Sequence, residues 1–326
     1  MPKPVCAILD DYQGVALSMA DWAAVERRAD LRVFREPFAS EDALVAAVGD
    51  CEIVVAMRER TPFRAATFER LPRLRLLVTT GMRNAAIDME AARARGITVC
   101  GTASLGEPPA EITWALLLAL AKHVVPENAS FRSNGPWQST VGADLRGRQL
   151  GLLGLGKIGS RVAAVGLAFG MDVVAWSQNL TQERAEPVGV RLAPSKASLL
   201  ETSDFVSIHL VLSERTRGLL GREDLRRMRP TAYLINTSRG PIVDEGALVE
   251  ALAEGWIAGA GLDVFEHEPD VTPGLLAMPN VVTTPHLGSA VMEVREQMAN
   301  IVVDNILALL DGKTPPNCVN PEVLQG

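Results

Sequence analysis

The chain has 326 residues, 48% of them hydrophobic, with 32 basic and 39 acidic residues and a net charge of −7. At roughly 100–200 residues per domain, this length predicts two domains, each large enough to bury its own core. The acidic balance, without a Lys/Arg-rich run, argues against a nucleic-acid partner. The four cysteines are scattered without a CxxC pair, so we expect no metal site.

Two features of the sequence indicate where in the cell the protein lies. The start, MPKPVCAILDD, has no apolar run ahead of Asp10 and Asp11, so we expect no signal peptide. The most apolar segments, residues 114–121 and 301–310, are too short to cross a bilayer core of about 30 Å. We therefore expect a soluble, cytoplasmic protein with reduced thiols and no membrane partner.

Short apolar runs alternate with amphipathic helical patterns along the first hundred residues. This alternation predicts parallel strands joined by right-handed crossovers. The predicted strands cover residues 5–9, 31–34, 53–57, 74–79 and 97–100, and the predicted helices cover residues 17–28, 41–48, 63–70 and 88–95.

A long apolar helix over residues 107–125, opened by Pro108 and Pro109, precedes a second alternating block. That block has a predicted helix at residues 158–169 and ends in a long helix at residues 290–310. Its predicted strands cover residues 149–153, 172–176, 205–208, 232–236, 259–264 and 281–283.

These patterns predict an α/β protein with two doubly wound parallel-sheet domains. Because the last helix follows the second block, we expect it to return to the first. The expected domains are therefore residues 1–103 with 291–326, and residues 104–290.

The second block contains the Gly-rich sequence GLLGLGKIG between an apolar strand and a helix. In the GxGxxG pattern, Gly154 permits a tight turn, Gly156 lets the backbone approach a pyrophosphate, and Gly159 lets helix and strand pack closely. We expect the diphosphate of a dinucleotide at the helix N-terminus, next to Lys157 and Ile158.

The strand at residues 172–176 leads into Ser177 and Gln178. An acidic residue at this point favours NAD, and an arginine accommodates the extra phosphate of NADP. Neither residue type stands here, so our hypothesis is that NAD and NADP are both usable. The alternative is that this turn is merely solvated.

Three further segments each place one polar residue just past a predicted strand. INTSRGPIVDE contains Arg239, GLDVFEHEP contains Glu268, and TPHLGS contains His286. Doubly wound sheets bind their ligands at this edge. Together the segments favour a hydride-transfer site, in which an arginine holds a carboxylate, a glutamate orients an imidazole, and a histidine moves a proton. Taken singly, each residue would be an ordinary turn or surface residue.

These motifs, with VSIHLVLSERTR and the closing Val319–Asn320 pair, resemble the D-isomer-specific 2-hydroxyacid dehydrogenase family nearly end to end. The family includes phosphoglycerate dehydrogenases and glyoxylate/hydroxypyruvate reductases. The resemblance implies a flavodoxin-like substrate domain, a Rossmann nucleotide-binding domain, and reversible NAD(P)H-dependent reduction of a 2-oxoacid to a D-2-hydroxyacid. Glyoxylate/hydroxypyruvate reductase is the favoured interpretation. Phosphoglycerate dehydrogenase and a dinucleotide-sensing corepressor-like interaction protein are the alternatives.

The resemblance also implies a role for individual residues. His286 would be the acid/base, Glu268 would favour its charged form, and Arg239 would bind the substrate carboxylate and polarise the carbonyl. The other residues that it implies on the cofactor side are Thr216, Thr237, Ser238, Asp263 and Gly288.

The first block departs from the family pattern in the loop after its fourth strand, which reads TGMRN. We expect Gly81, Met82 and Arg83 to contact the substrate, with Arg83 as a second cation for a carboxylate or phosphate. Alternatively, Arg83 points outward and caps the next helix. The family resemblance also implies a homodimer, and the apolar helix over residues 107–125 could supply its interface.

Overall fold

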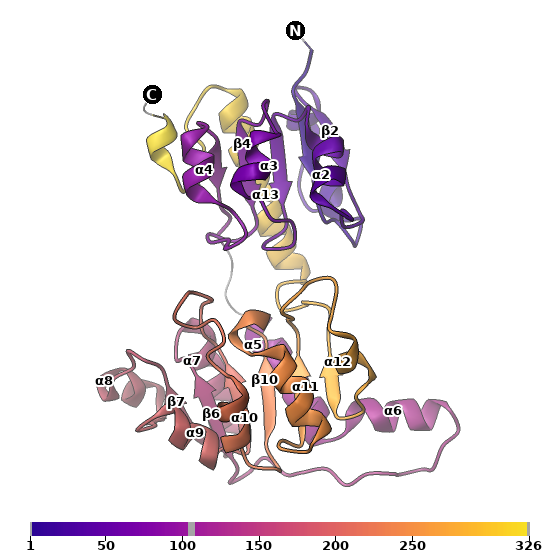
Figure 1. Ribbon diagram of the computed structural model, residues 1–326, viewed down its shortest axis with the longest axis vertical. Coiled ribbons are helices and arrows are strands. Elements are labelled where there is room, and N and C mark those ends of the chain that lie inside the picture. Colours follow the sequence, from indigo (N-terminus) through magenta and orange to yellow (C-terminus); the bar gives the residue numbers. More distant parts are fainter. Residues whose placement is uncertain (1, 104–107, 325–326) are drawn as a thin grey trace. The chain divides into compact units, whose positions relative to one another are not determined.

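The structure is a computed structural model that describes residues 2–103 and 108–324 (Figure 1). The chain divides into two units, Met1–Leu105 with Val291–Gly326, and Gly106–Ala290. The predicted helix start at Glu107 and the predicted domain start at residue 104 lie outside the described residues. Each unit is described by itself.

The N-terminal unit is built on a parallel sheet in the order β2-β1-β3-β4-β5, the order of flavodoxin-like folds. The predicted fold class is confirmed. Strands β3 and β4 are buried along their whole length, because helices cover both faces of the sheet. The strands are β1 (Val5–Ile8), β2 (Asp30–Val33), β3 (Ile53–Ala56), β4 (Leu76–Thr79) and β5 (Thr98–Cys100).

Two apolar cores lie on opposite faces of this sheet. Helices α2, α3 and α4 cover one face, and α1 with α13 covers the other. On the second face, Val302, Val303 and Ile306 of α13 pack with Cys6 and Ile8 of β1. The helical elements are η1 (Ala16–Ser18), α1 (Ala23–Glu26), α2 (Glu41–Val48), α3 (Ala65–Glu69), α4 (Met89–Ala94), α13 (Met292–Leu310) and η4 (Pro321–Leu324).

The prediction of one helix over residues 17–28 is wrong, because this segment forms η1 and α1 instead. The carboxylate of Asp11 accepts hydrogen bonds from the backbone of Val15 and Ala16, so a short turn begins before the predicted start. The indole of Trp22 donates to the Ala16 carbonyl and closes that turn. These side-chain contacts compete with a continuous helix.

The second unit contains a fully parallel sheet in the order β12-β11-β10-β9-β6-β7-β8. Read from β8, this is the Rossmann order with one strand added at the far edge, and the prediction is confirmed. The strands are β6 (Gln149–Leu153), β7 (Asp172–Trp176), β8 (Arg191–Leu192), β9 (Phe205–Ile208), β10 (Tyr233–Asn236), β11 (Gly259–Leu262) and β12 (Val281–Thr283).

Helices cover both faces of this sheet as well. One core forms under α5, α7 and α8, and the other under α9 to α12. The helical elements are α5 (Pro108–Ala121), α6 (Val124–Arg132), α7 (Lys157–Ala168), α8 (Gln182–Ala185), η2 (Glu186–Val188), α9 (Lys196–Thr202), α10 (Arg222–Arg227), η3 (Gly240–Ile242), α11 (Glu245–Ala253) and α12 (Pro273–Ala277). No helix in the described part of the chain combines the length and the apolar character needed to span a bilayer.

The long apolar helix predicted over residues 107–125 is interrupted. His123 has a φ of 51°, and this left-handed residue ends α5 and starts α6. The buried leucines Leu116, Leu117 and Leu120 belong to the core of the helix's own unit. The buried side of α5 is therefore part of the core of its own unit.

Candidate active site

The Gly-rich turn joins β6 to α7 at the carboxyl edge of the second sheet. Gly154 has a φ of 105° and its amide donates to the Trp176 carbonyl over 2.9 Å. A Cβ at Gly154 would lie 2.5 Å from the His209 carbonyl oxygen, and one at Gly159 would lie 2.2 Å from the Gly154 carbonyl oxygen. Only glycine fits at these two positions.

Gly156 differs from its two neighbours in the motif. It is exposed at the N-terminus of α7, and a Cβ placed there would meet no heavy atom within 4 Å. The fold of this unit therefore does not require a glycine at this position. A bound diphosphate would require a glycine here. The free N–H groups and the positive dipole end of α7 attract the diphosphate to this position, where a side chain would stand in its way. The site fits a dinucleotide.

The predicted ribose and loop contacts lie at the same edge of the sheet. Ser177 is half-buried and Gln178 is exposed, both directly after β7. The hydroxyl of Thr216 accepts from the Ser213 amide over 2.8 Å and donates to the Val211 carbonyl over 2.7 Å, which holds the turn after β9.

His286 and Glu268 form a hydrogen-bonded pair. The imidazole Nδ1 lies 2.7 Å from Glu268 Oε2, with 16% and 22% of the two side chains exposed. The other carboxylate oxygen of Glu268 accepts from the Phe265 amide over 3.0 Å, which fixes its orientation. A carboxylate on Nδ1 makes this nitrogen the protonated one and leaves Nε2 to exchange a proton with a ligand.

The loop that carries His286 is anchored by Asp263, a fully buried residue after β11. Its carboxylate accepts from the Thr284 hydroxyl at 2.7 Å, the Leu287 amide at 2.6 Å and the Gly288 amide at 2.8 Å. Burial raises the pKa of Asp263. Asp263 and Gly288, predicted as cofactor-side residues, are therefore hydrogen-bonded to each other. The bonds of Asp263 hold the loop on both sides of His286.

Arg239 follows β10 at the N-terminus of η3. Asn236 fixes this segment, because its amide nitrogen donates to the Arg239 carbonyl over 3.0 Å and its amide oxygen accepts from the Ser238 amide over 3.1 Å. The Ser238 hydroxyl donates to the Leu210 carbonyl. A Cβ at Gly240 would lie 1.9 Å from the Phe265 carbonyl carbon. The Arg239 segment thus packs directly on the segment that leads to Glu268.

The structure adds three positioning residues that the sequence reasoning missed. Besides Asn236, buried Glu245 accepts from the Glu266 amide over 2.7 Å and from the Thr272 hydroxyl, which holds the turn before Glu268. Thr113 of α5 places its hydroxyl 2.7 Å from that of Thr237. An acidic residue in the first turn of a helix is usually exposed and interacts with the helix dipole. The sequence therefore did not indicate that Glu245 is buried and holds this turn.

The predicted substrate loop belongs to the N-terminal unit. Gly81 has a φ of 102°, and its amide donates to the Thr102 hydroxyl over 2.8 Å. Met82 is 48% exposed and Arg83 is also exposed. The expected alternative role of Arg83 as a helix cap is wrong, because Asp88 caps α4 through the Ala91 amide. Whether Arg83 contacts substrate remains a prediction.

In the described part of the chain, no three His, Cys, Asp or Glu side chains gather into a possible metal site. A Rossmann sheet, a glycine turn open to a diphosphate and a histidine–glutamate pair at the same edge define the class of nicotinamide-dependent oxidoreductases.

The chain belongs to the D-isomer specific 2-hydroxyacid dehydrogenase family. Residues 114–288 match the model of the D-isomer specific 2-hydroxyacid dehydrogenase, NAD binding domain. It is 42% identical over 295 residues to a glyoxylate reductase of Korarchaeum cryptofilum, covering 88% of each chain. It is also 45% identical over 265 residues to a glyoxylate reductase of Aeropyrum pernix, covering 78% of each.

Solved structures agree with this assignment. A phosphoglycerate oxidoreductase from Vibrio cholerae is 33% identical with a TM-score of 0.89, covering 96% of this chain and 100% of that one. An NADPH-dependent glyoxylate/hydroxypyruvate reductase from Sinorhizobium meliloti, in complex with NADP and malonate, is 28% identical with a TM-score of 0.79, covering 98% and 97%. The protein is an NAD(P)-dependent 2-hydroxyacid dehydrogenase, and the predicted family and enzyme class are confirmed.

Proposed function

We propose that the protein reduces glyoxylate and hydroxypyruvate to their 2-hydroxyacids, and that Arg239, Glu268 and His286 carry the reaction. The observation that supports this most directly is the 2.7 Å hydrogen bond between His286 and Glu268. Relatives named glyoxylate reductase support the choice of substrate.

The residues of the site would act as follows. A bound reduced nicotinamide supplies the hydride to the carbonyl carbon. His286 gives its Nε2 proton to the carbonyl oxygen and takes a proton back in the oxidation direction. Glu268 stabilises the imidazolium through Nδ1. Arg239 binds the substrate carboxylate through its planar guanidinium, whose fork matches two oxygens.

The cofactor would lie at the carboxyl edge of the second sheet, with its diphosphate on the Gly-rich turn. Gly154, Gly156, Lys157, Ile158 and Gly159 form this turn and the start of α7. Ser177 and Gln178 would face the adenosine ribose, followed by the contacts of Thr216, Thr237 and Ser238. No acidic side chain stands at the end of β7 to repel a 2′-phosphate, which supports the use of both NADH and NADPH.

We also propose roles for the two units. The unit Gly106–Ala290 is the dinucleotide-binding domain, and the unit Met1–Leu105 with Val291–Gly326 is the substrate domain. In the substrate domain, Gly81, Met82 and Arg83 would contact the oxoacid. Met82 and Arg83 are exposed at the carboxyl end of β4, which supports this assignment.

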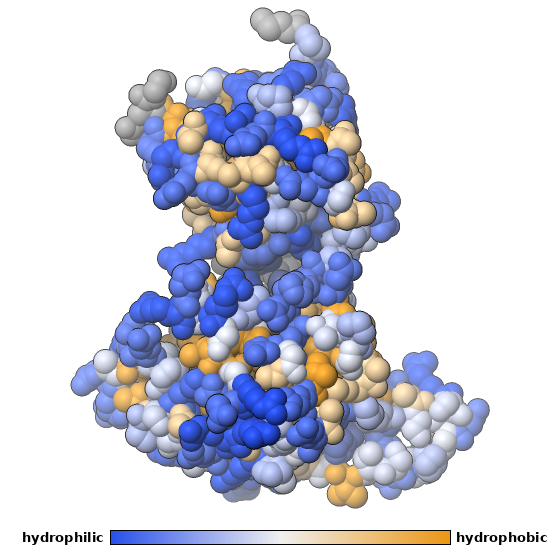
Figure 2. All heavy atoms as spheres, in the orientation of Figure 1, coloured by the Kyte–Doolittle hydropathy of each residue, from blue (hydrophilic) through white to orange (hydrophobic). Residues whose placement is uncertain are grey.

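The protein would function as a homodimer, with the interface on α6 and the loop that follows it rather than on α5. This arm stands away from the rest of its unit (Figure 1), and Figure 2 shows isolated hydrophobic residues among mainly polar ones there. Two large exposed rings, Phe131 and Trp137, lie in contact on it, and grouped apolar side chains at a surface can mark a contact site. The exposed apolar side chains are Val124 at 53%, Val125 at 49%, Phe131 at 59%, Trp137 at 79% and Val141 at 93%.

A substrate panel tests the proposed activity. Loss of nicotinamide absorbance is followed with NADH and NADPH on glyoxylate, hydroxypyruvate, pyruvate, phenylpyruvate and 3-phosphohydroxypyruvate. We expect fast turnover of the first two, and its loss in His286→Asn but not in His267→Asn, which changes an exposed histidine of the same unit. Preference for 3-phosphohydroxypyruvate would favour a phosphoglycerate dehydrogenase. Negligible turnover of every oxoacid would contradict the proposal.

A further inference from the structure

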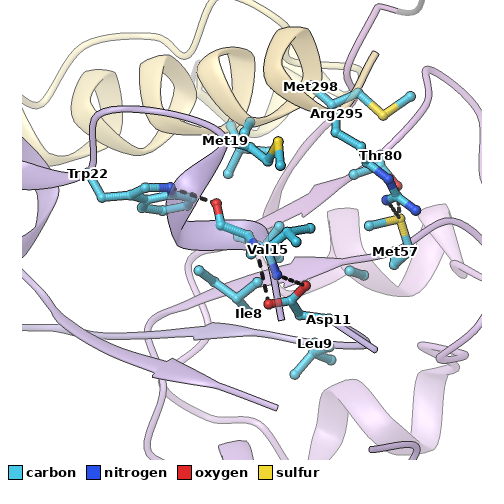
Figure 3. Close-up of a pocket in the computed structure, with 15 residues that line it drawn as sticks. Ile8, Leu9, Asp11, Val15, Met19, Trp22, Met57, Thr80, Arg295 and Met298 are labelled. Carbon is cyan, nitrogen blue, oxygen red and sulfur yellow. Dashed lines mark hydrogen bonds between the residues drawn. The ribbon is translucent and has the colours of Figure 1, made fainter. Parts of the chain in front are cut away.

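A pocket in the N-terminal unit lies between η1 and α13, over the carboxyl ends of β1 and β3 (Figure 3). Its walls are largely apolar and include Val15, Met19, Trp22, Met57 and Met298. The indole nitrogen of Trp22 is already bonded to the Ala16 carbonyl, so the tryptophan contributes only its apolar ring to a ligand. The walls therefore suit a hydrocarbon group.

The basic residue in this lining is Arg295, which reaches the pocket from α13 (Figure 3). Its Nη1 lies 3.1 Å from the thioether sulfur of Met57, a weak acceptor. Its Nε is buried and donates to no acceptor in the described part of the chain. A buried guanidinium N–H without an acceptor is unfavourable, so this side chain suits an anion.

The acidic side chain in the same wall is already engaged. Asp11 is buried, and its two carboxylate oxygens accept from the Val15 amide at 3.0 Å and the Ala16 amide at 3.1 Å. These bonds hold the start of η1. Asp11 therefore offers Arg295 charge compensation from a distance, without a direct ion pair.

A second positive charge lies near Arg295. Arg60 places its guanidinium 4.6 Å from the centre of the Tyr12 ring and donates to the Asp10 carbonyl over 3.2 Å. Burial, and then repulsion from Arg60, lower the pKa of Arg295, and Asp11 only partly opposes this. The carboxylates of Asp10 and Asp11 lie near these two guanidinium groups, but both are bonded to other donors, so the Nε of Arg295 keeps no acceptor among the described residues.

We propose that this pocket binds a small monocarboxylate with a short apolar chain. The carboxylate would pair with the Arg295 guanidinium, whose fork of N–H donors matches two carboxylate oxygens. The chain would pack against Val15, Met19 and Met298. Every lining residue belongs to the N-terminal unit, whereas the proposed catalytic Arg239 belongs to the other unit. Because the lining residue Thr80 directly precedes Gly81 of the proposed substrate loop, the test below includes a variant of Arg239 to separate the two sites.

Methionine signals in the full-length chain provide a direct test. The protein is produced with ¹³C-methyl methionine, and the signals of Met19, Met57 and Met298 are identified from single Met→Leu variants. Titration with butyrate should shift these three signals saturably, while Met228 and Met278 in the other unit do not move. Butylamine, which has the same chain and a positive charge, should leave all five signals in place.

Variants separate this pocket from the catalytic site. Arg295→Gln should weaken butyrate binding at least tenfold, and Ala299→Phe, which fills the pocket but keeps the arginine, should abolish it. An unchanged signal of Met89, which packs on the other core of the same unit and does not line the pocket, shows that these variants fold. Binding should persist in Arg239→Leu. The proposal is overturned if the shifts are absent, if they survive Arg295→Gln, if they vanish in Arg239→Leu, or if butylamine produces them.

Discussion

The backbone of His286 lies in the left-handed region, with a φ of 53°. A residue other than glycine stays there only when its surroundings hold it. Three hydrogen bonds to Asp263 hold the loop, and Glu268 holds the ring. The position of the imidazole is therefore set by carboxylates from the neighbouring strand end, and changes to those acids should act on the histidine.

Replacing Glu268 with glutamine should slow oxoacid reduction. The Glu268 carboxylate lies 2.7 Å from Nδ1 of His286 and would stabilise the charge that the imidazole carries during proton transfer. The amide keeps the size of the side chain but removes its negative charge, so kcat/KM should fall about tenfold or more. The rate is measured with the wild type, Glu268→Gln and Glu266→Gln, whose exposed carboxylate serves as the control. An unchanged kcat/KM in Glu268→Gln would speak against the pairing.

His209 should make stability depend on pH. Burial lowers the pKa of His209 to about 4, whereas an unfolded histidine titrates near 6.5. The unfolded chain therefore binds an extra proton between these values. The stability conferred by neutral His209 is complete above pH 6.5 and is lost as the pH falls toward 4.

Urea unfolding at pH 7 and pH 4.5 measures this contribution. Relative to His209→Gln, the wild type should lose about 2–3 kcal/mol more unfolding free energy on acidification. His267→Gln, a change at an exposed histidine, should behave like the wild type. Equal losses in wild type and His209→Gln would refute the prediction.

The proposed catalytic residues could be predicted from the sequence, but the residues that position them could not. Arg239, Glu268 and His286 stand in motifs that follow apolar strands, so strand ends and residue type were enough to select them. Asn236 and Glu245 act through hydrogen bonds to backbone groups of distant segments. Such contacts depend on the packing of loops, for which a single sequence has no periodic signal.

At the scale of elements, buried parallel strands were the easiest to predict. Strands β6, β7, β9 and β12 have the predicted bounds, because continuous apolar runs end at polar or turn residues. Helices were harder. The helix α6 was missed and the helix over residues 17–28 was overpredicted, since the left-handed His123 and the distant Asp11 decide where helical turns begin.

The Gly-rich turn allows two alanine substitutions to be compared. Gly159→Ala would place a methyl 2.2 Å from the Gly154 carbonyl oxygen and should destabilise the unit by about 1–3 kcal/mol. Gly156→Ala meets no protein atom within 4 Å, so its melting temperature should match the wild type. Its methyl group would face the diphosphate, and the dissociation constant for NADH should rise at least tenfold.

Thermal unfolding and NADH fluorescence titration measure the two effects independently. A Gly156→Ala protein that binds NADH as the wild type does would contradict the proposed approach of the diphosphate to this turn. Equal melting temperatures for Gly159→Ala and wild type would contradict the close packing of α7 on the turn.

At the scale of the whole molecule, the arm formed by α6 and the following loop should decide the oligomeric state. Trp137 and Val141 are the most exposed apolar side chains on it, and Phe131 packs edge-on against Trp137 with ring centres 5.5 Å apart. Burial of apolar groups of this size under a second subunit would stabilise the dimer.

Sedimentation velocity tests this arrangement. The double variant Trp137→Ser/Val141→Ser should raise the dimer dissociation constant at least tenfold. Val211→Ser, which removes a comparably exposed valine elsewhere in the same unit, should leave it unchanged. A double variant that sediments as the wild type does would place the interface elsewhere or leave the protein monomeric.

The return of the chain to its first unit determines the order in which the protein can be completed on the ribosome. The segment Gly106–Ala290 is continuous and can finish folding while the C-terminus is still being translated. The sheet made first must wait, because Val302, Val303 and Ile306 cover its face only after the last helix has emerged. The earliest part of the nascent chain is thus the last to close its core, and the part of its apolar face that α1 does not cover stays open to chaperones until then.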